Sequence, residues 1–460
     1  MDKIKMLQER REKVIACSKE IRKVIFDLVD SDSFVELSGY SFSKNDFYGE
    51  GAEGEGVITG FATIEGYPIY VVAQNFNVLS GGVSNANCEK ILKCLSLAEK
   101  NSTPIVYILN SLGVQIGEGV TVLEGLAKVL AKSARLRGIV PQFTIINGEV
   151  YGQSALFTAN ADFNFFMKNA VVAANSPLVI SAKSGKNLSK EEIGSADALT
   201  KTNLVSFVAN SLTEVRLNIF KILNVLPDYN SLVVENGIDL NKPFTKLNKD
   251  VSSKNLINAV FDKDDFVEIG KNAPEVKCVL GRVGGISVAA IIFDSEKVVE
   301  LNPQILAKIN SFVEFAGYYN LPFVTFVNTT GIEANTCVNN SLVLKQISKY
   351  MENFELLENA KISVVYKKAI GLGYTLFGAK SMGFDYSIAF ANANIALFDD
   401  IQGAEIEFSA NSVNREKLAQ KYADENSDPI NAAKNGFIDD IIEPQFVKQY
   451  LVASLQMLLK

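Results

Sequence analysis

The sequence predicts an α/β protein built from two related domains, and three observations support this. Apolar runs alternate with segments of helical periodicity along both halves of the chain. The run 105–109 is apolar at successive positions. This is typical of strands that helices cover on both faces. Three motifs recur in the same order in the two halves: residues 33–37 and 265–269, residues 103–113 and 321–331, and the glycine turns at Gly152 and Gly371.

The length and the repeat together set the expected domain organisation. A chain of 460 residues is too long for one core. The motif offsets of 232, 218 and 219 residues describe a pair of domains rather than a solenoid, whose periods are about 20–50 residues. We expect an N-terminal domain over residues 1–245 and a C-terminal domain over residues 246–460, with the linker inside the polar stretch 183–250. Paired domains favour a site at a domain boundary or a symmetric interface.

The first half contains a hairpin followed by alternating helices and strands. Residues 1–30 have the pattern of one basic amphipathic helix. The apolar runs 57–64 and 69–73 flank the turn 65–68, which is a hairpin signal. The remaining expected elements are a helix over 85–100, a strand over 105–109, a helix over 118–136, a strand over 143–146 and a helix that starts at Gly152.

The second half repeats this order. The expected elements are strands over 277–282 and 286–293, a helix over 303–319, a strand over 323–327, a helix over 340–358, a strand over 362–366, a helix over 372–381 and a helical tail over 411–460.

Composition excludes several classes of protein. The net charge of −7 is spread along the chain, so we expect no nucleic-acid partner, which would need a basic footprint. No apolar run reaches about 18 residues, so no membrane-spanning helix is expected. The start of the chain is charged and lacks the apolar core of a signal peptide. We therefore expect a cytoplasmic protein.

The chain has no histidine, which removes the usual general base and excludes Ser-His-Asp and Cys-His catalysis. We expect no metal site. The five cysteines form no Cys-x-x-Cys pair, and we expect buried, reduced thiols. They are Cys17, Cys88, Cys94, Cys278 and Cys337. Any catalysis must use backbone dipoles, carboxylates, lysines, tyrosines or a cofactor.

Two glycine turns follow buried strands in each half, at Gly113 and Gly152 and again at Gly331 and Gly371. A backbone N–H at a helix start has no partner within its helix, and glycine allows close approach of a ligand. Two converging N–H groups would stabilise an oxyanion on a carbonyl or enolate. Simple helix entry with close packing remains the alternative explanation.

The motifs together resemble the carboxyltransferase subunits of biotin-dependent acyl-CoA carboxylases and decarboxylases. The resemblance covers about residues 20–410 and is most specific over Gly138-Ile139-Val140-Pro141-Gln142. The other motifs are Gly56 to Gly60, Gly81-Gly82, Ser111-x-Gly113 with Glu118-Gly119, Tyr151-Gly152 followed by Asp162, Leu321 to Thr325 and Lys368 to Gly371. The family implies two tandem crotonase-like domains, with the β-β-α superhelix of the ClpP/crotonase fold.

The resemblance implies that a carboxyl group moves between biotin and the α-carbon of an acyl-CoA. The N-terminal domain would hold the acyl-CoA, and the C-terminal domain of a neighbouring subunit would hold biotin on a separate carrier protein. This arrangement implies a dimer or hexamer. Further implied partners are a biotin carboxylase or membrane decarboxylase subunits, and the latter would place the protein at the periphery of a membrane complex.

The same resemblance assigns the site residues. The backbone N–H groups of Gly152 and Gln153 would form one oxyanion hole, and those of Leu372 and Gly373 the other. The expected substrate-binding glycines are Gly81, Gly82, Gly113, Gly331 and Gly371.

Three functions are compatible with the sequence. The first is an active carboxyltransferase subunit. The second is a non-catalytic paralogue with a structural role in such a complex, because Leu112, Gln153 and Leu372 stand where the family has small residues. The third is a crotonase-like acyl-CoA enzyme that does not use biotin and takes Glu118 or Glu149 as its base.

Overall fold

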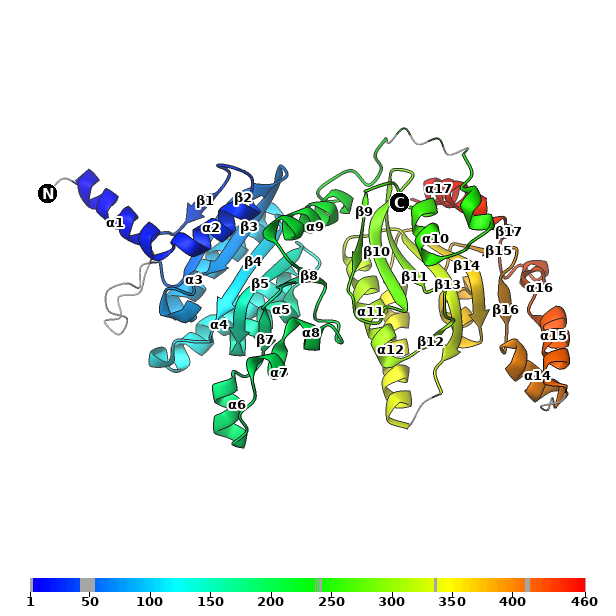
Figure 1. The fold of residues 1–460 in the computed structure, drawn as a ribbon. Helices are drawn as coiled ribbons and strands as arrows, with labels where there is room; N and C mark the ends of the chain where they lie inside the picture. Colours follow the sequence, from blue (N-terminus) through cyan, green and yellow to red (C-terminus); the bar gives the residue numbers. More distant parts are fainter. Residues whose placement is uncertain are drawn as a thin grey trace. The chain divides into compact units, whose positions relative to one another are not determined.

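The chain forms two compact units, Met1–Phe220 and Lys221–Lys460, in the computed structural model (Figure 1). The structure describes residues 3–41, 54–235, 237, 239, 242–334, 337–409 and 414–459, without the side chains of 337 and 338. The sequence placed the boundary after residue 245, whereas the contacts divide the chain after Phe220.

The first unit contains an eight-stranded sheet in the order β1-β2-β3-β4-β5-β6-β8, with β7 paired to β5. Pairing is antiparallel from β1 to β3 and parallel from β3 onward. The strands are β1 Val35–Leu37, β2 Val57–Ile64, β3 Tyr67–Gln74, β4 Ile105–Ser111, β5 Gln142–Tyr151, β6 Phe163–Met167, β7 Val171–Ala173 and β8 Phe207–Ala209.

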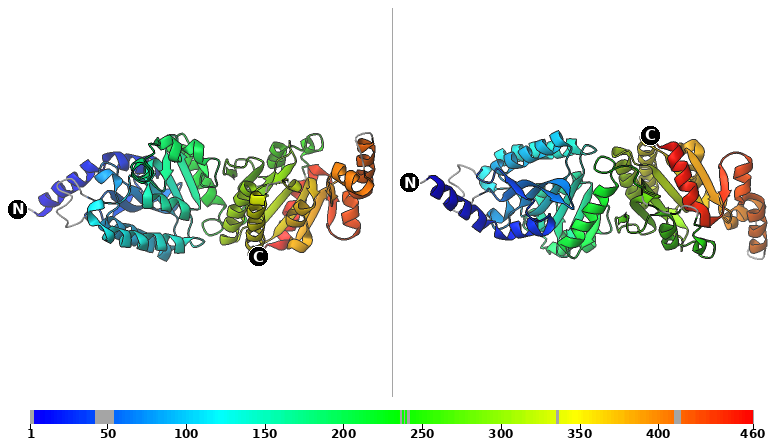
Figure 2. Two further views of the ribbon diagram at one scale, coloured as in Figure 1. Left: turned by 90° about the horizontal axis from the view of Figure 1, so that it is seen from below. Right: turned by 90° about the horizontal axis from the view of Figure 1, so that it is seen from above.

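Helices cover this sheet because the strands are apolar on both faces. Helices α3 (Asn85–Asn101) and α4 (Val120–Leu136) pack together beside the sheet (Figure 2). Their buried side chains share one core with alternate residues of β3, β4 and β5. The other helical elements are α1 Lys3–Cys17, α2 Lys19–Leu28, η2 Leu79–Gly81, η3 Ile116–Glu118, η4 Gly152–Leu156, α5 Phe157–Asn160, α6 Pro177–Ser184, α7 Lys190–Gly194, α8 Ala196–Leu199 and α9 Leu212–Val225.

The second unit contains a nine-stranded sheet in the order β17-β15-β14-β13-β11-β10-β9, with β12 on β13 and β16 on β14. The strands are β9 Phe266–Ile269, β10 Val276–Val283, β11 Ile286–Phe293, β12 Val299–Leu301, β13 Phe323–Ile332, β14 Lys361–Ile370, β15 Tyr386–Phe390, β16 Asn394–Ala396 and β17 Asp440–Ile442.

One face of this second sheet packs on α10 (Ser253–Val260) and α17 (Val447–Leu458), whose buried side chains belong to one core with those of β11, β13 and β14. The remaining helical elements are η5 Thr245–Asn248, α11 Pro303–Tyr318, α12 Cys337–Glu355, α13 Leu372–Phe377, η6 Lys380–Met382, α14 Asp400–Phe408, α15 Arg415–Asn426, α16 Pro429–Lys434 and η7 Pro444–Phe446.

The internal repeat is a repeat of structure. The order β1-β2-β3-α3-β4-α4-β5 in the first unit matches β9-β10-β11-α11-β13-α12-β14 in the second. The recurring segment 33–37 ends in β1, and its copy 265–269 forms β9, and each strand pairs with the first strand of a hairpin. The predicted α/β class with two related domains is therefore confirmed.

Several sequence-based boundaries need correction. The helix expected over residues 1–30 is two helices, because Ser18 leaves helical geometry at φ −120° and ψ 12°. The polar stretch 183–250 contains the division between the two units and also β8, which pairs with β6 of the first sheet. Strand β17 interrupts the helical tail and pairs with β15. Helix α13 ends at Phe377 rather than near residue 381.

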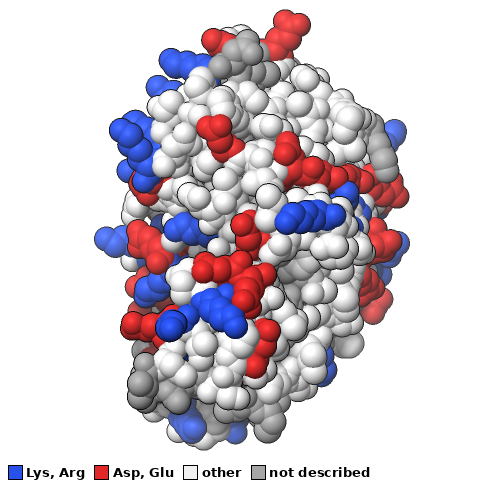
Figure 3. All heavy atoms as spheres, turned by 90° about the vertical axis from the view of Figure 1, so that its right-hand side faces the viewer, with Lys and Arg blue, Asp and Glu red and all other residues white. Residues whose placement is uncertain are grey.

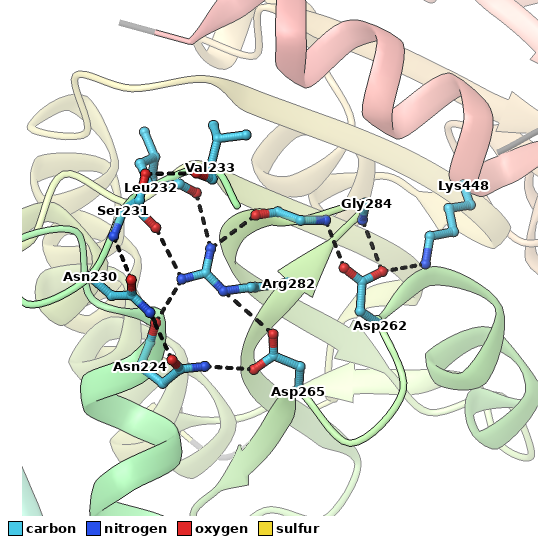
Figure 4. A network of polar contacts seen from close by, with 11 residues as sticks. Asn224, Asn230, Ser231, Leu232, Val233, Asp262, Asp265, Arg282, Gly284 and Lys448 are labelled. Atoms are coloured by element: carbon cyan, nitrogen blue, oxygen red, sulfur yellow. Dashed lines mark hydrogen bonds and ion pairs between the residues drawn. The ribbon is translucent and has the colours of Figure 1, made fainter. Parts of the chain in front are cut away.

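A buried arginine shows why residues 221–235 pack with the second unit (Figure 4). Arg282 of β10 is 1% exposed. Its guanidinium donates to the carbonyl oxygens of Asn224, Ser231 and Gly285 at 2.7–3.0 Å. In addition, Ser287 N–H donates to Leu232 O at 2.9 Å. These bonds fix the segment to the β10–β11 hairpin, and nothing in local periodicity predicts them.

An aspartate closes the hairpin turn in each unit. Asp30 accepts the N–H groups of Glu65 and Gly66, both at 2.9 Å, and Arg216 of α9 at 2.5 Å. Asp262 accepts the N–H groups of Gly284 and Gly285 at 3.0 and 2.7 Å, and Lys448 of α17 at 2.6 Å (Figure 4). The offset between these aspartates is 232 residues, as for the first sequence motif.

One face of the molecule shows how its charged side chains are distributed. On the face drawn in Figure 3, lysines and arginines are interspersed with aspartates and glutamates.

In the described part of the chain, no helix is both long and apolar enough to cross a bilayer. Cys88, Cys94 and Cys278 are buried thiols, whereas Cys17 is a half-buried thiol. The side chain of Cys337 lies outside the described residues.

Candidate active site

The two glycine turns of the first unit lie side by side. Strands β4 and β5 are paired up to Ser111 and Val150, so both strands end at the same edge of the sheet. The Ser154 hydroxyl donates to Ser111 Oγ at 3.2 Å, and Gly113 N–H donates to the same Ser111 Oγ at 3.2 Å. A buried hydrogen-bond chain therefore joins the turn that contains Gly113 to the turn that begins at Gly152.

The glycines of the first unit have two different roles. A Cβ on Gly81 would lie 2.1 Å from Asn110 O, and a Cβ on Gly82 would lie 2.2 Å from the Gln115 side-chain nitrogen. Packing therefore requires glycine at these two positions. Gly113 and Gly152 have φ values of +128° and +65°, and no atom lies within 4 Å of an added Cβ. These two turns face open space, as a ligand would need.

The second unit repeats this arrangement at β13 and β14. Gly331 N–H donates to Thr329 Oγ1 at 3.1 Å, as Gly113 does to Ser111. A Cβ on Gly331 would lie 3.7 Å from Leu372 N and 3.8 Å from Gly373 N. The Gly331 turn therefore lies against the first residues of α13, while Gly371 adopts φ +52° as the N-cap.

Backbone donors divide the expected site residues into two groups. The N–H groups of five of the glycines are bonded within the protein: Gly81, Gly82, Gly113, Gly331 and Gly371. Gly152 and Gln153 begin η4, and Leu372 and Gly373 begin α13. The first N–H groups of a helix have no acceptor in their own helix. The residues that begin η4 and α13 therefore offer N–H donors, whereas the five bonded glycines shape the backbone of the turns.

A pocket of about 520 Å³ opens beside the Gly371 turn. Leu372 lines it and is 44% exposed. The rest of the lining combines apolar side chains with three amides: Tyr374, Ile395, Leu397, Phe437, Asn426, Asn431 and Asn435 are among its members. The lining therefore offers both polar and apolar surface to a ligand.

The charged residues beside the two turns have opposite signs. Glu149, three residues before Gly152, pairs with Lys190 at 2.6 Å and accepts the Tyr151 hydroxyl at 2.9 Å. Lys368, three residues before Gly371, pairs with Asp399. Burial acts to raise the pKa of Glu149, but the bonds from Lys190 and Tyr151 outweigh it and lower the pKa. Burial, followed by the bond to Glu149, raises the pKa of Tyr151.

Neither carboxylate proposed as a general base is placed to act as one. Glu118 accepts Asn85 N–H at 2.7 Å at the start of α3, so it caps that helix. Glu149 is held as an anion by Lys190, whereas a general base works best with a pKa near the operating pH. The structure thus gives no support to the alternative of a biotin-independent enzyme with either residue as base.

Sequence reasoning missed the residues that connect the turns. Gln74 donates to Ser154 Oγ at 3.4 Å and accepts Asn110 N–H at 3.0 Å, which links β3 to both turns. The repeat contained one usable signal: Ser111 and Thr329 are hydroxyl residues at equivalent positions, each two residues before a turn glycine.

Each of the two related α/β units has paired glycine turns at the ends of parallel strands, followed by a helix whose first N–H groups have no acceptor within that helix. Residues 17–460 match the family described as "Carboxyl transferase domain". The chain belongs to this family and is a carboxyltransferase. The alternative of a non-catalytic paralogue is not favoured.

Curated relatives are similar in sequence to this chain along nearly its whole length. The α subunit of methylmalonyl-CoA decarboxylase from Veillonella parvula is 29% identical over 489 residues, covering 99% of this chain and 96% of that protein. The propionyl-CoA carboxylase β chain of Cereibacter sphaeroides is 28% identical over 472 residues, covering 96% and 90%. The human mitochondrial propionyl-CoA carboxylase β chain is 28% identical over 479 residues, covering 98% and 86%.

Solved structures show the same fold. A crystal structure of transcarboxylase 12S, described as a hexamer with hydrolysed methylmalonyl-CoA bound, has a TM-score of 0.90 at 24% identity. It covers 98% of this chain and 94% of that chain. A single-chain, multi-domain long-chain acyl-CoA carboxylase has a TM-score of 0.86 at 17% identity, covering 98% of this chain and 49% of that chain. The predicted crotonase-like carboxyltransferase fold is confirmed.

Proposed function

We propose that this carboxyltransferase moves a carboxyl group between biotin on a separate carrier protein and the α-carbon of an acyl-CoA. In the carboxylation direction, the α-carbon loses a proton and forms a new C–C bond, while the C–N bond to biotin breaks and the ureido nitrogen takes the proton. The observation that carries the proposal is the pair of turns with free backbone donors, at Gly152 and at Leu372. The relatives named for acyl-CoA carboxylases and decarboxylases support it.

On the acyl-CoA side, the N–H groups of Gly152 and Gln153 would donate to the thioester oxygen as it gains negative charge. Such donors act strongly where water is excluded and need no proton transfer of their own. Gly113 would allow the thioester to approach, because no protein atom lies within 4 Å of the position of its missing Cβ. The packed glycines Gly81 and Gly82 would support this side rather than contact the ligand.

On the biotin side, Leu372 and Gly373 would donate to the ureido oxygen. Biotin supplies the carboxyl group that is transferred. The pocket beside Gly371 fits it, because three asparagine amides can bond a cyclic urea and the apolar lining can hold a hydrocarbon chain. Gly331 would keep the backbone of the turn close to these donors.

We further propose that the protein is an oligomer, a dimer or a hexamer, in which the acyl-CoA side of one copy works with the biotin side of another. Its partners would be a biotin carrier protein and either a biotin carboxylase or membrane decarboxylase subunits. An obligate interface of this kind buries more than about 2,000 Å². Light scattering at micromolar concentration should show at least a dimer, and a monomer would count against the shared site.

The test of the reaction is carboxyl exchange between free biotin and malonyl-CoA or methylmalonyl-CoA, together with binding of acyl-CoA and of free biotin measured separately. Exchange supports the proposal. Binding of acyl-CoA without biotin binding or exchange would favour a biotin-independent enzyme. Binding of neither ligand by an intact oligomer would favour the non-catalytic paralogue with a structural role.

A further inference from the structure

The turn before α3 has an unusual backbone. Leu79, Ser80 and Gly81 have φ values of 52°, 53° and 65°, so three successive residues are left-handed. Side chains disfavour this region, so Leu79 and Ser80 keep this conformation only where their surroundings impose it. Something in the first unit must therefore hold this turn, which we call the left-handed turn 79–81.

The left-handed turn supports the Gly113 turn directly. Leu112 N–H donates to Ser80 O at 3.2 Å, and Val83 N–H donates to Gly113 O at 2.9 Å. The side chain of Gln115 donates to Leu79 O at 3.2 Å. Any movement of residues 79–83 would therefore move the backbone around Gly113.

A buried polar cluster holds the turn from the other side. Lys90 of α3 is 2% exposed, and its ammonium donates to Gly54 O at 2.8 Å and to Val57 O at 2.5 Å. Glu55, between these two residues, is 1% exposed and accepts the Ser84 hydroxyl at 2.7 Å. Lys90 therefore anchors the segment 54–57, which we call the entry loop of β2.

The entry loop lies against the two residues that flank the left-handed turn, Val78 and Gly82, at the position of its glycine. Gly56 has φ +66°, and a Cβ there would lie 3.1 Å from Val78 O and 3.7 Å from Gly82 O. A continuous path of contacts thus runs from Lys90 through the entry loop to residues 78–82 and on to Gly113.

We propose that Lys90 is a positioning residue for the acyl-CoA side of the site: through the entry loop it holds the left-handed turn 79–81 and so places the Gly113 turn. This inference rests on the proposed function, which assigns the acyl-CoA to the first unit. Lys90 contacts no substrate in this scheme and acts through backbone carbonyls.

The second unit provides a matched control. Lys308 of α11 stands 218 residues after Lys90, is 6% exposed, and donates to four carbonyl oxygens of the segment 270–276. The segment that leads to α11 contains strand β12, and the described residues 286–319 include no positive φ. The segment that Lys308 anchors includes positive φ at Gly270 and Ala273, and the entry loop that Lys90 anchors also includes positive φ, so the two lysines have matched buried settings. The two halves differ in that no left-handed turn like 79–81 directly precedes α11.

The experiment compares Lys90→Met with Lys308→Met in the full-length protein. Both variants remove the ammonium and keep the apolar stem, so both should lower the unfolding midpoint. Only Lys90→Met should raise the KM for the acyl-CoA, by about tenfold or more, with the KM for free biotin unchanged, because small displacements at a site are costly. Hydrogen exchange at the amides of residues 79–83 should also accelerate only in Lys90→Met.

Equal effects of the two variants on the KM for the acyl-CoA, or unchanged exchange at residues 79–83 in Lys90→Met, would overturn the inference. If Lys90→Met does not fold, Glu55→Gln is measured with the same readouts, because it weakens the cluster while keeping the volume. A wild-type protein that fails to exchange carboxyl groups would refute the proposed function, while hydrogen exchange would still decide whether Lys90 holds the turn.

Discussion

The two halves of the chain share their supporting residues and differ at their glycine turns. Asp30 and Asp262 close equivalent hairpins, and Lys90 and Lys308 anchor equivalent loops. Three residues before the turn glycine, however, the first half has Glu149 and the second has Lys368. The scaffold is therefore duplicated, whereas the charged residue beside the glycine turn differs in sign between the two halves.

This difference suggests how one fold can serve two ligands. Backbone donors at the start of a helix are insensitive to side-chain identity, so both turns can stabilise an oxyanion. The neighbouring side chains are free to differ, and the ion pairs place opposite charges at the two strand ends. The predictions below test whether the two turns act on different substrates, and whether the shared supports are equally important.

The largest effect is expected at Gly152. Gly152→Pro would remove an N–H donor and force φ from +65° to about −65°. Acyl-CoA turnover should fall by about 10²–10³, as for loss of an oxyanion-hole donor. The control is Gly185→Pro, another glycine with φ +67° and open space, located at the end of α6. Unchanged turnover in a folded Gly152→Pro protein would reject the assignment.

A smaller effect is expected at the shared hairpin supports. Asp262→Asn removes the charge that Gly284, Gly285 and Lys448 bond, and should lower the free energy of unfolding by about 1–3 kcal/mol. Asp30→Asn should have a similar effect in the first half, since Asp30 also accepts two turn N–H groups and a cation. Denaturant titration measures both. A large effect in only one half would show that the supports are not equivalent.

Replacing Leu372 should change the KM for biotin by about tenfold or less, which is typical of small changes in an apolar pocket. The wild type should exchange carboxyl groups with free biotin, and Leu372→Gly should change the KM for biotin but not that for the acyl-CoA. Leu397→Gly, in the same pocket, is the control for lost apolar surface. Exchange only in Leu372→Gly would mean that the leucine blocks the wild-type pocket, and would favour the non-catalytic paralogue.

The smallest expected effect is the pH dependence of the stability that Asp30 contributes to the first half. Burial acts to raise the pKa of Asp30, but the bonds from Thr63, Gly66 and Glu65 and the charge of Arg216 outweigh it and lower the pKa. The resulting stability is present above the unfolded pKa of about 3.9 and is lost as the pH falls through the lowered folded value. Unfolding curves of wild type and Asp30→Asn should therefore converge at low pH. A constant difference down to pH about 2 would contradict this.

The sequence by itself determined the repeat, the α/β class and most elements, because apolar periodicity and turn residues act over short stretches of chain. The repeated motifs also placed β4 and β13 before their glycine turns. The sequence identified the turn residues, but it did not show which of them offer backbone N–H donors to a ligand. Ser111 and Thr329 occupy the N–H groups of Gly113 and Gly331 through local hydroxyl bonds.

Only the tertiary structure decided which glycines face open space and which are packed. Gly81 and Gly113 look alike in sequence, yet an added Cβ would clash with Asn110 O at the first and meet no atom at the second. The links from Ser111 to Ser154 and from Lys90 to the entry loop join residues far apart along the chain. Such contacts depend on how strands and helices pack, and a local pattern in one sequence contains no information about them.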